Sequence, residues 1–267
     1  MTEEQAIQDM TAFLEKHGFT VERIPARKDA KRPDVAVRYG DELYLIEQKS
    51  KGDNPEEREE ERKALQQTKI IDRAKPLGPR STLSGILEGA LEQIEAHPDA
   101  GIAFKIVWVT NWGVWCGANA ESMVKGLYGL RHVFDVDDHG GEMRDCYYLG
   151  FSDFRRFSEI DAVVIVEGGS LEILVNEFSP RYERFIQSQF AVRLRQGVRD
   201  PRAHVASGDS YSLRDFEGDR KDIRAGLDHL ASQLGVRRME TMDMNEIHVV
   251  ANVDRFLDEH QGDDPIS

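Results

Sequence analysis

The sequence lacks any hydrophobic run of the roughly 18 apolar residues that a transmembrane helix needs. Its first ten residues, MTEEQAIQDM, are acidic and amphipathic, whereas a secretory signal begins basic and then becomes apolar. We therefore expect a cytoplasmic protein that makes no use of a membrane. Hydrophobic residues make up 40% of the 267 positions, which is sufficient for a core of its own.

Cysteine is almost absent, with only Cys116 and Cys146 in the chain. They form no CxxC pair and have no cluster of histidines beside them, so the sequence predicts neither a zinc site nor a disulfide scaffold. We expect two reduced thiols with a structural role.

Positive charge is also in short supply. The 35 Lys and Arg residues against 49 Asp and Glu give a net charge of −14. This balance argues against a protein that binds nucleic acid over its whole surface, because neutralising phosphates requires Lys and Arg. The charge is unevenly placed, however, since residues 23–32 (RIPARKDAKR) carry five basic residues against one acidic residue. A local basic groove on an acidic body remains compatible with the composition.

The first 110 residues predict an α/β core. A helix is expected from Thr2, with Gln5 in the capping-box position and Gly18 as its end, followed by a strand over 19–24. Strands over 34–38 and 42–49 should form a hairpin across residues 39–41, and a second helix from Ser81 to about 97 should precede a central strand over 102–109. The charged segment 50–81, with a helix-start signal at Asn54 and Pro55, is interpreted as a solvated helix or an insertion.

The second half, 111–267, is predicted to be an α-rich accessory region packed on that core. Aromatic and glycine-rich sequence without a clear period extends to about 157, and a hairpin follows over 161–167 and 171–176. Helices are expected over 179–190, 213–234 and 250–257. We find no internal repeat and no long linker.

The segment RPDVAVRYGDELYLIEQKSK, residues 32–51, carries the chemistry. In its second strand Leu43, Leu45, Glu47 and Lys49 alternate onto one face, and the opposite face is also largely apolar. A strand that is apolar on both faces is normally interior, so a carboxylate and an ammonium should lie at the edge of a buried sheet. Buried charges are tolerated when they are paired or bind a metal. The alternative is a surface hairpin with a solvated Glu and Lys, which such a strand disfavours.

Asp34 begins the neighbouring strand and lies about as far before the turn as Glu47 lies after it. Antiparallel pairing should therefore bring the two carboxylates within reach of one divalent ion, since cross-strand Cβ atoms are roughly 4.5–5.5 Å apart. Two carboxylates with water suit Mg²⁺, and Mn²⁺ is an acceptable substitute. Lys49 should then orient the attacking water and offset charge on a phosphate.

Pro33-Asp34, a gap of twelve residues and then Glu47-Gln48-Lys49 resemble the PD-(D/E)XK superfamily of restriction-endonuclease-like nucleases. The order of helix, three strands, helix and strand over residues 1–110 is similar to the core of that superfamily. The resemblance implies a mixed sheet flanked by helices, Asp34 and Glu47 as metal ligands, the backbone carbonyl of Gln48 as a further ligand, and Lys49 as the catalytic lysine. It also leaves open an additional acidic residue from the first helix and a glutamine from the helix after the lysine strand. The candidates are Glu3, Glu4 and Glu15 for the acid, and Gln93, Gln66 and Gln67 for the glutamine.

The function implied is Mg²⁺-dependent hydrolysis of DNA phosphodiester bonds by an endonuclease. The length of the chain favours a restriction or defence nuclease, whose second half would grip substrate or form a homodimer. The alternative is a catalytically inactive module on the same fold that binds protein or nucleic acid, which the acidic charge favours. RNA as the substrate is a third hypothesis.

Basic residues around the motif are candidates for contacts with phosphates, although an ordinary solvated loop explains them equally well. They are Arg23, Arg27, Lys28, Lys31, Arg32 and Lys51. The arginine-rich segment 181–202 either contacts a nucleic-acid backbone or packs against a neighbouring helix. Three tryptophans, Trp108, Trp112 and Trp115, fit a core or its rim better than a platform for stacked bases.

Overall fold

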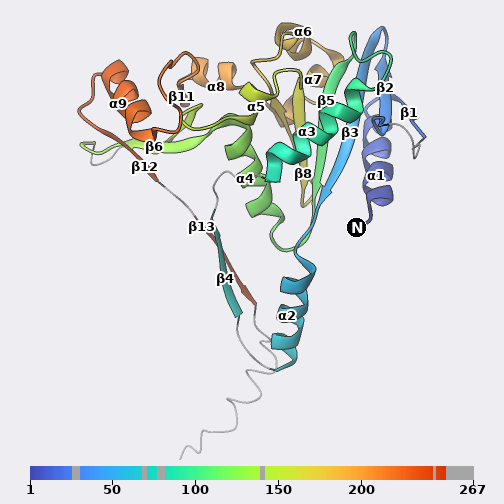
Figure 1. Cartoon of the computed structure of the whole chain (residues 1–267), viewed down its shortest axis with the longest axis horizontal. Coiled ribbons are helices and arrows are strands. Elements are labelled where there is room, and N and C mark those ends of the chain that lie inside the picture. Colours follow the sequence, from blue (N-terminus) through green and yellow to red (C-terminus); the bar gives the residue numbers. More distant parts are fainter. Residues whose placement is uncertain (26–30, 68–70, 77–81, 139–141, 243–244, 251–267) are drawn as a thin grey trace, which may run out of the picture.

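The computed structural model describes residues 1–25, 31–67, 71–76, 82–138, 142–242 and 245–250. Within this part of the chain, a central sheet of seven strands runs across the molecule (Figure 1). Its strand order is β1 (Thr20–Arg23), β2 (Val35–Tyr39), β3 (Glu42–Lys51), β5 (Phe104–Asn111), β8 (Ala162–Glu167), β9 (Ser170–Val175) and β10 (Val198–Arg199).

The sheet is mixed. β1, β2 and β3 pair antiparallel, whereas β3, β5 and β8 pair parallel to one another. β9 returns antiparallel to β8, and β10 pairs parallel to β9. Because β3, β5 and β8 run in the same direction, their C-terminal ends lie along one edge of the sheet.

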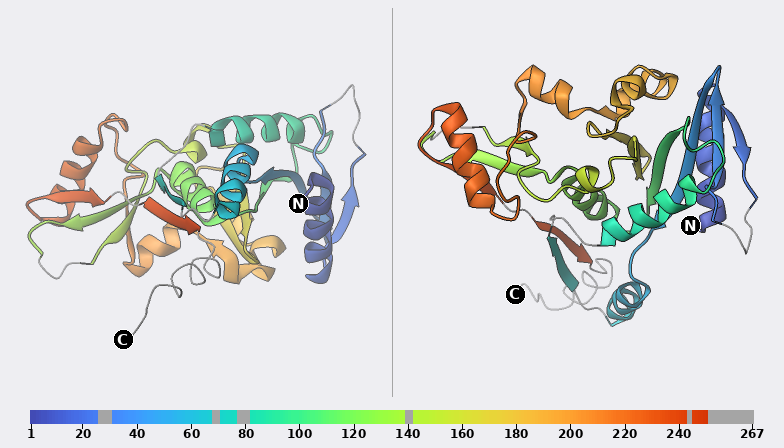
Figure 2. Two further views of the ribbon diagram at one scale, coloured as in Figure 1. Left: turned by 90° about the horizontal axis from the view of Figure 1, so that it is seen from below. Right: turned by 45° about the horizontal axis from the view of Figure 1, so that its top comes forward.

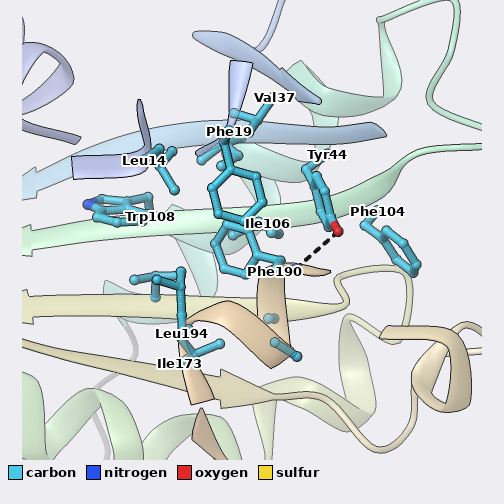
Figure 3. Packing of buried hydrophobic residues seen from close by; sticks show 14 of the residues in the cluster. Leu14, Phe19, Val37, Tyr44, Phe104, Ile106, Trp108, Ile173, Phe190 and Leu194 are labelled. Carbon is cyan, nitrogen blue, oxygen red and sulfur yellow. Dashed lines mark hydrogen bonds between the residues drawn. The ribbon is translucent and has the colours of Figure 1, made fainter. Parts of the chain in front are cut away.

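One face of the sheet is covered by α1 (Glu3–Lys16), α6 (Tyr182–Ile186) and α7 (Gln189–Arg193). The side chains of Tyr44 and Ile46 in β3 point into this layer. Figure 3 shows Tyr44 packed near Phe104 and Phe190, and the Tyr44 hydroxyl accepts a hydrogen bond from the Phe190 amide at 3.1 Å. This aromatic layer joins the first and second halves of the chain.

The other face is covered by α3 (Thr82–Glu95), α4 (Cys116–Tyr128) and the short α5 (Asp153–Arg156). Leu43 and Leu45 of β3 lie in a cluster with Ile94 of α3, and every residue of β5 is buried. The apolar character of β3 and β5 on both faces, which the sequence predicts, therefore follows from two helical layers. The glutamate and lysine of the motif share the α3 side with Leu43 and Leu45.

Two smaller sheets complete the described part of the chain (Figures 1 and 2). One pairs β13 (Asn245–Val250) with β4 (Ile71–Pro76), next to α2 (Pro55–Gln66), which follows β3 directly. The other sheet lies beside α9 (Ile223–Leu234). Two further short helices are η1 (Arg195–Gly197), which precedes β10, and α8 (Pro201–Ser207), which precedes β11. The strand order of this second sheet is β11 (Ser210–Ser212), β7 (Arg144–Tyr147), β6 (Arg131–Asp135) and β12 (Met239–Met242).

Local signals account for the boundaries of the first elements. The Thr2 hydroxyl accepts a hydrogen bond from the Gln5 amide at 3.2 Å and begins α1, and the Asn54 side chain accepts one from the Glu56 amide at 3.0 Å and begins α2. Gly40 adopts φ +56° in the turn between β2 and β3, a conformation that favours glycine. The expected mixed sheet flanked by helices is confirmed.

The second half departs from the sequence prediction. It is mixed rather than α-rich, because β6 to β12 lie there together with β13, and β8, β9 and β10 extend the central sheet beyond residue 110. The helix predicted over 179–190 is two short helices, since the Ser188 side chain accepts a hydrogen bond from the Ala191 amide and caps a new one. Of the helix predicted over 213–234, only α9 forms.

The helix predicted over 250–257 begins at Val250, which belongs to β13, and its remaining residues lie outside the described part of the chain. Among the described residues, no helix combines the length and the apolar character that spanning a bilayer requires.

Candidate metal and phosphodiesterase site

The register of the first hairpin brings Asp34 next to Glu47. Val35 pairs with Ile46 and Ala36 with Leu45, so one further step along the ladder sets Asp34 opposite Glu47. Asp34 has the same alternation as Ala36, which packs on the α3 side of the sheet. The two carboxylates therefore belong to one face. The backbone N–H of Gln48 fixes the position of Asp34 by donating a hydrogen bond to its Oδ2 at 2.8 Å.

Glu47 is a buried carboxylate with only half of its hydrogen-bonding capacity used. Its side chain is 1% exposed, and its Oε1 accepts a hydrogen bond from the Lys49 ammonium at 2.5 Å. Its Oε2 is buried and has no hydrogen-bond partner among the described residues. The pKa of Glu47 is raised to about 7, mainly because the side chain is buried; the Lys49 ammonium opposes this rise, and the neighbouring Asp34 carboxylate adds to it.

Gln93 of α3 joins the two strands of the motif. Its Oε1 accepts a hydrogen bond from Lys49 Nζ at 2.9 Å, and its amide group donates one to the Arg32 carbonyl at 3.3 Å. Of the three glutamines that the sequence left as candidates, Gln93 is the one with these contacts. Gln66 and Gln67 lie exposed at the end of α2. α3 is therefore the helix that packs against the motif, and α2 lies in the charged segment 50–81.

The side chain of Gln48 lies on the opposite face of β3 from Glu47. It is fully buried, and its amide nitrogen approaches the hydroxyls of Ser50 at 3.1 Å and Thr110 at 3.4 Å. These contacts tie the middle of the motif to β5. Only the backbone of Gln48 is in a position to serve the Asp34 and Glu47 face.

The acidic residues of the first helix are placed differently from one another. Glu4 forms two hydrogen bonds with the Arg23 guanidinium, at 2.6 and 2.9 Å, and these lower the pKa of Glu4 to about 2. Glu3 and Glu15 are exposed on α1. No group of three or more His, Cys, Asp or Glu side chains suited to a metal is present among the described residues. Asp34 and Glu47 are thus a pair without a third acidic partner in that part of the chain.

The candidate phosphate-binding residues also differ from one another in their surroundings. Arg23 is paired with Glu4, and Lys31 is paired with Glu92 of α3. Arg32 and Lys51 are half-buried at the two ends of the motif. Arg27 and Lys28 lie outside the described residues.

The arginine-rich segment 181–202 is largely committed to contacts within the protein. Arg181 pairs with Asp161 at 3.0 Å, and Arg199 pairs with Glu172 at 2.5 Å. Arg202 pairs with Glu177 at 3.1 Å. These ion pairs favour the packing interpretation of this segment over a contact with nucleic acid.

Sequence reasoning missed a set of contacts between the C-terminal ends of β3 and β5, which we call the clamp. In it Gly52 and Asp53, after β3, contact residues 112–115, after β5. The Asp53 carboxylate accepts hydrogen bonds from the amides of Val114 at 2.6 Å and Trp115 at 3.1 Å. The Trp112 ring lies against Gly52, where an added Cβ would be 2.3 Å from it, and the Arg58 guanidinium lies 5.7 Å from the centre of the ring. The sequence GDNP carries only a turn signal, so nothing in it pointed to this long-range contact.

The same clamp decides the role of the tryptophans. Trp112 has Gly52 and Arg58 against its ring, and Trp108 and Trp115 are 2% and 1% exposed. They are core and rim residues rather than a platform for stacked bases. Cys116 and Cys146 are free thiols, as expected.

The two carboxylates fit a small divalent ion. An unpartnered buried carboxylate oxygen is unfavourable, and Mg²⁺ takes oxygen ligands from one or two carboxylates while it keeps several waters. Asp34 and Glu47 would hold the ion, with Lys49 beside them. Comparison of the chain with protein-family models, with curated proteins and with solved structures found no match. Any assignment of function therefore depends on the geometry and chemistry of this site.

Proposed function

We propose that this chain is a Mg²⁺-dependent endonuclease of the PD-(D/E)XK type, which hydrolyses phosphodiester bonds of DNA in a restriction or defence system. The observation that carries the proposal is the buried Glu47 carboxylate, whose Oε2 has no hydrogen-bond partner among the described residues. Leaving a buried acceptor unsatisfied costs about 1–3 kcal/mol, and more for a charged group. A fold that maintains this arrangement beside a second carboxylate is suited to a cation.

A simple ion pair explains the site less well than a bound cation does. Lys49 satisfies Oε1 alone, and the nearby Asp34 carboxylate adds repulsion that a simple ion pair would not need. Replacing such a pair with apolar residues is often neutral or stabilising, so stability alone gives little reason for it. A divalent ion would remove the repulsion between the carboxylates and the desolvation penalty of Glu47 together.

When bound, the ion would supply Lewis acidity toward a phosphate oxygen and water. The residues of the chain have separate tasks. Asp34, fixed by the Gln48 amide, and Glu47 would hold the ion at the strand ends. Lys49 would orient the attacking water and stabilise negative charge on the phosphate. Gln93 would keep the Lys49 ammonium group in place by accepting its hydrogen bond.

DNA as the substrate is supported by the resemblance of the motif to nucleases, and not by charge. The basic residues that we propose as phosphate contacts are Arg23, Arg27, Lys28, Lys31, Arg32 and Lys51. Because Arg23 and Lys31 already have carboxylate partners, phosphates would have to compete with Glu4 and Glu92 for them.

The test is nicking of supercoiled plasmid by the full chain with and without Mg²⁺, compared with Asp34→Asn, Glu47→Gln and Lys49→Met. We expect cleavage by the wild type to require Mg²⁺ or Mn²⁺ and all three variants to lose at least 100-fold in rate. The matched control is Asp41→Asn, which removes an exposed carboxylate from the turn of the same hairpin and should cut normally. Circular dichroism and thermal melting show whether each variant is folded.

A second candidate function is a non-catalytic binding module on this fold, which the net charge of −14 and the internal pairing of the arginines in 181–202 favour. The two proposals make opposite predictions. A module would bind its partner equally with and without a divalent ion and would cut no plasmid, linear or single-stranded DNA. Competition between DNA and RNA in the same assay distinguishes a ribonuclease from a deoxyribonuclease.

A further inference from the structure

A cluster of three arginines lies in the second half of the chain, outside the proposed nuclease site. Arg155 belongs to α5, and Arg214 and Arg220 belong to the loop between β11 and α9. Arg155 and residues 214–220 line an open hollow of about 690 Å³. Sites for small molecules have volumes of this order.

Arg155 and Arg220 are held side by side by backbone carbonyls. The Nη2 atoms of both side chains donate a hydrogen bond to the carbonyl of Arg214, Arg220 at 3.1 Å. Arg220 also donates to the carbonyls of Tyr148 at 2.5 Å and Phe216 at 2.6 Å. Within the described part of the chain, neither guanidinium forms an ion pair with a carboxylate. Carbonyls position a guanidinium but bring no net charge to offset it.

The third guanidinium is only partly neutralised. Arg214 Nε lies 3.3 Å from Glu177 Oε2, and the same oxygen lies 3.1 Å from Arg202 Nε, so one carboxylate serves two cations. The Phe178 ring lies 4.6 Å from the guanidinium carbon of Arg155 and 5.7 Å from that of Arg214. Two cations from different elements are therefore held against one ring.

The electrostatics of the cluster agree with an excess of positive charge. Partial burial lowers the pKa of Arg155; the Tyr148 hydroxyl opposes this change, and the Arg214 guanidinium adds to it. Partial burial also lowers the pKa of Arg220, the Arg155 guanidinium adds to the change, and Asp215 opposes it. Because arginine stays protonated in proteins, this repulsion persists in the folded chain until an anion offsets it.

Holding the loop in place explains Arg220 but not Arg155. Arg220 already bridges four carbonyls of the loop and of Tyr148, so the loop has its cation. A neutral amide could donate the single hydrogen bond that Arg155 gives to the Arg214 carbonyl. A second charged fork beside the first is expected where an oxyanion binds, because guanidinium N–H groups match phosphate oxygens in pairs.

The charges favour the terminal phosphate of a small molecule over a nucleic-acid backbone. A phosphomonoester carries about 1.5 to 2 negative charges at neutral pH, which matches the two guanidiniums without a carboxylate partner. A phosphodiester carries one negative charge, and a polymer of them would have to pass the rim of the hollow. The exposed acidic side chains of Asp215, Glu217 and Asp219 lie there and would repel it.

We propose that Arg155, Arg214 and Arg220 form a binding site for the terminal phosphate of a small phosphomonoester. Arg155 and Arg214 would contact the phosphate from opposite elements, and Arg220 would hold the loop and add to the positive charge. This site does not depend on the proposed nuclease function.

The experiment is isothermal titration calorimetry of the full chain with inorganic phosphate and with adenosine 5′-monophosphate, at pH 7.5 and without divalent ions. We expect one site per chain with a dissociation constant of about 1 mM or lower. Arg155→Gln should weaken binding by about tenfold or more, because it removes a charge-assisted contact. Arg155→Lys keeps the charge but not the planar fork and should fall between the two.

Two control variants locate the site. Arg156→Gln alters the next residue of α5, which pairs with Glu88 at 3.6 Å, and should leave the affinity unchanged. Lys49→Met should also leave it unchanged, which separates this site from the proposed nuclease site. Circular dichroism and thermal melting establish that each variant is folded.

The proposal fails if neither probe binds at 10 mM, or if Arg155→Gln and Arg155→Lys both bind as the wild type does. An equal loss in Arg156→Gln would show a general effect of surface charge and would overturn it too. A DNA oligonucleotide without terminal phosphates gives the last comparison. If it binds more tightly than adenosine 5′-monophosphate and loses affinity in Arg155→Gln, the ligand is a nucleic-acid backbone and the small-molecule assignment is wrong.

Discussion

The Lys49 ammonium donates a hydrogen bond to Gln93 Oε1 at 2.9 Å and another to Glu47 Oε1 at 2.5 Å, so a residue of α3 shares the lysine with the carboxylate beside it. If Glu47 bound a cation, Gln93 would remain as a partner of the ammonium. The same side chain donates to the Arg32 carbonyl and thereby supports the chain just before Asp34.

Gln93→Ala should lower the rate of plasmid cleavage by about 10- to 100-fold, a range typical for residues that orient the groups of a metal site. Gln93→Glu retains an oxygen acceptor for Lys49 and should recover part of the rate. It also places a second carboxylate beside the Lys49 ammonium, so the pH–rate profile should shift. Gln67→Ala at the exposed end of α2 is the control. A purely structural role would lower the melting temperature of Gln93→Ala without changing the profile.

The binding of Mg²⁺ should depend on pH through Glu47. Burial and the nearby Asp34 raise the pKa of Glu47 to about 7, and the ion binds only the ionised carboxylate. Above pH 7 the apparent affinity should be nearly constant, and below it the affinity should fall up to tenfold per pH unit. Calorimetry in two buffers of different ionisation enthalpy should detect release of close to one proton at pH 6. An affinity that is flat from pH 5.5 to 8 would contradict the assignment.

The stability of the metal-free protein should also depend on pH through Glu47. It should fall as the pH rises, whereas the affinity for Mg²⁺ should increase. The folded-state pKa of Glu47 lies above the ordinary value of 4.5, so the folded protein binds the proton more tightly than the unfolded chain does. The contribution is fully present below about pH 4.5 and is lost as the pH rises to 7, by up to roughly 3 kcal/mol. The difference in unfolding free energy between wild type and Glu47→Gln, from urea melts, should show this slope. Excess Mg²⁺ should reverse it.

The sequence was sufficient for the hairpin and its motif but not for their surroundings. The faces of β3 follow from simple alternation, and the spacing of Asp34 and Glu47 around the turn follows from antiparallel register. The choice of Gln93 over Gln66 and Gln67 depends on α3 packing under β3, which no local pattern encodes. For the same reason, the sequence could not show that Arg23 pairs with Glu4, because residues 19 positions apart meet only through the fold.

The second half shows where periodicity fails. The segment 179–190 has helical spacing throughout, yet α6 ends at Ile186 and Ser188 caps the next helix, since its hydroxyl competes for backbone amides. Val250 reads equally well as a helix or a strand residue, and pairing with Ile71, far away in the sequence, places it in β13. Short apolar runs are ambiguous until their partners are known.

Replacement of Asp34 should separate its two roles. Asparagine keeps an oxygen that can accept the hydrogen bond from the Gln48 backbone N–H. The unfolding free energy of Asp34→Asn should therefore lie within about 1 kcal/mol of the wild-type value, although the variant should lose Mn²⁺ binding. Asp34→Ala removes the acceptor as well and should cost about 1.5–3 kcal/mol, because the hydrogen bond is to a charged group. Equal stability of the two variants in urea melts would show that the Gln48 contact contributes little.

The clamp at the ends of β3 and β5 gives a test of how rigidly the site is held. A Cβ on Gly52 would come within 2.3 Å of the Trp112 ring, which lies between this residue and Arg58. The ring would have to move, and overpacking of this kind costs about 1–3 kcal/mol. Gly52→Ala should therefore lower the unfolding free energy by that amount.

The matched control is Gly85→Ala on α3, where an added Cβ meets nothing within 4 Å and the backbone is helical. That substitution should stabilise the protein by about 0.5–1 kcal/mol, since alanine favours the helix over glycine. Because Gly52 follows directly after β3, which carries Lys49 and Lys51 near its end, Gly52→Ala should also lower the cleavage rate, whereas Gly85→Ala should not. If Gly52→Ala is destabilised but cuts at the normal rate, the clamp supports the fold without positioning the lysines, and the two strand ends move independently of the site.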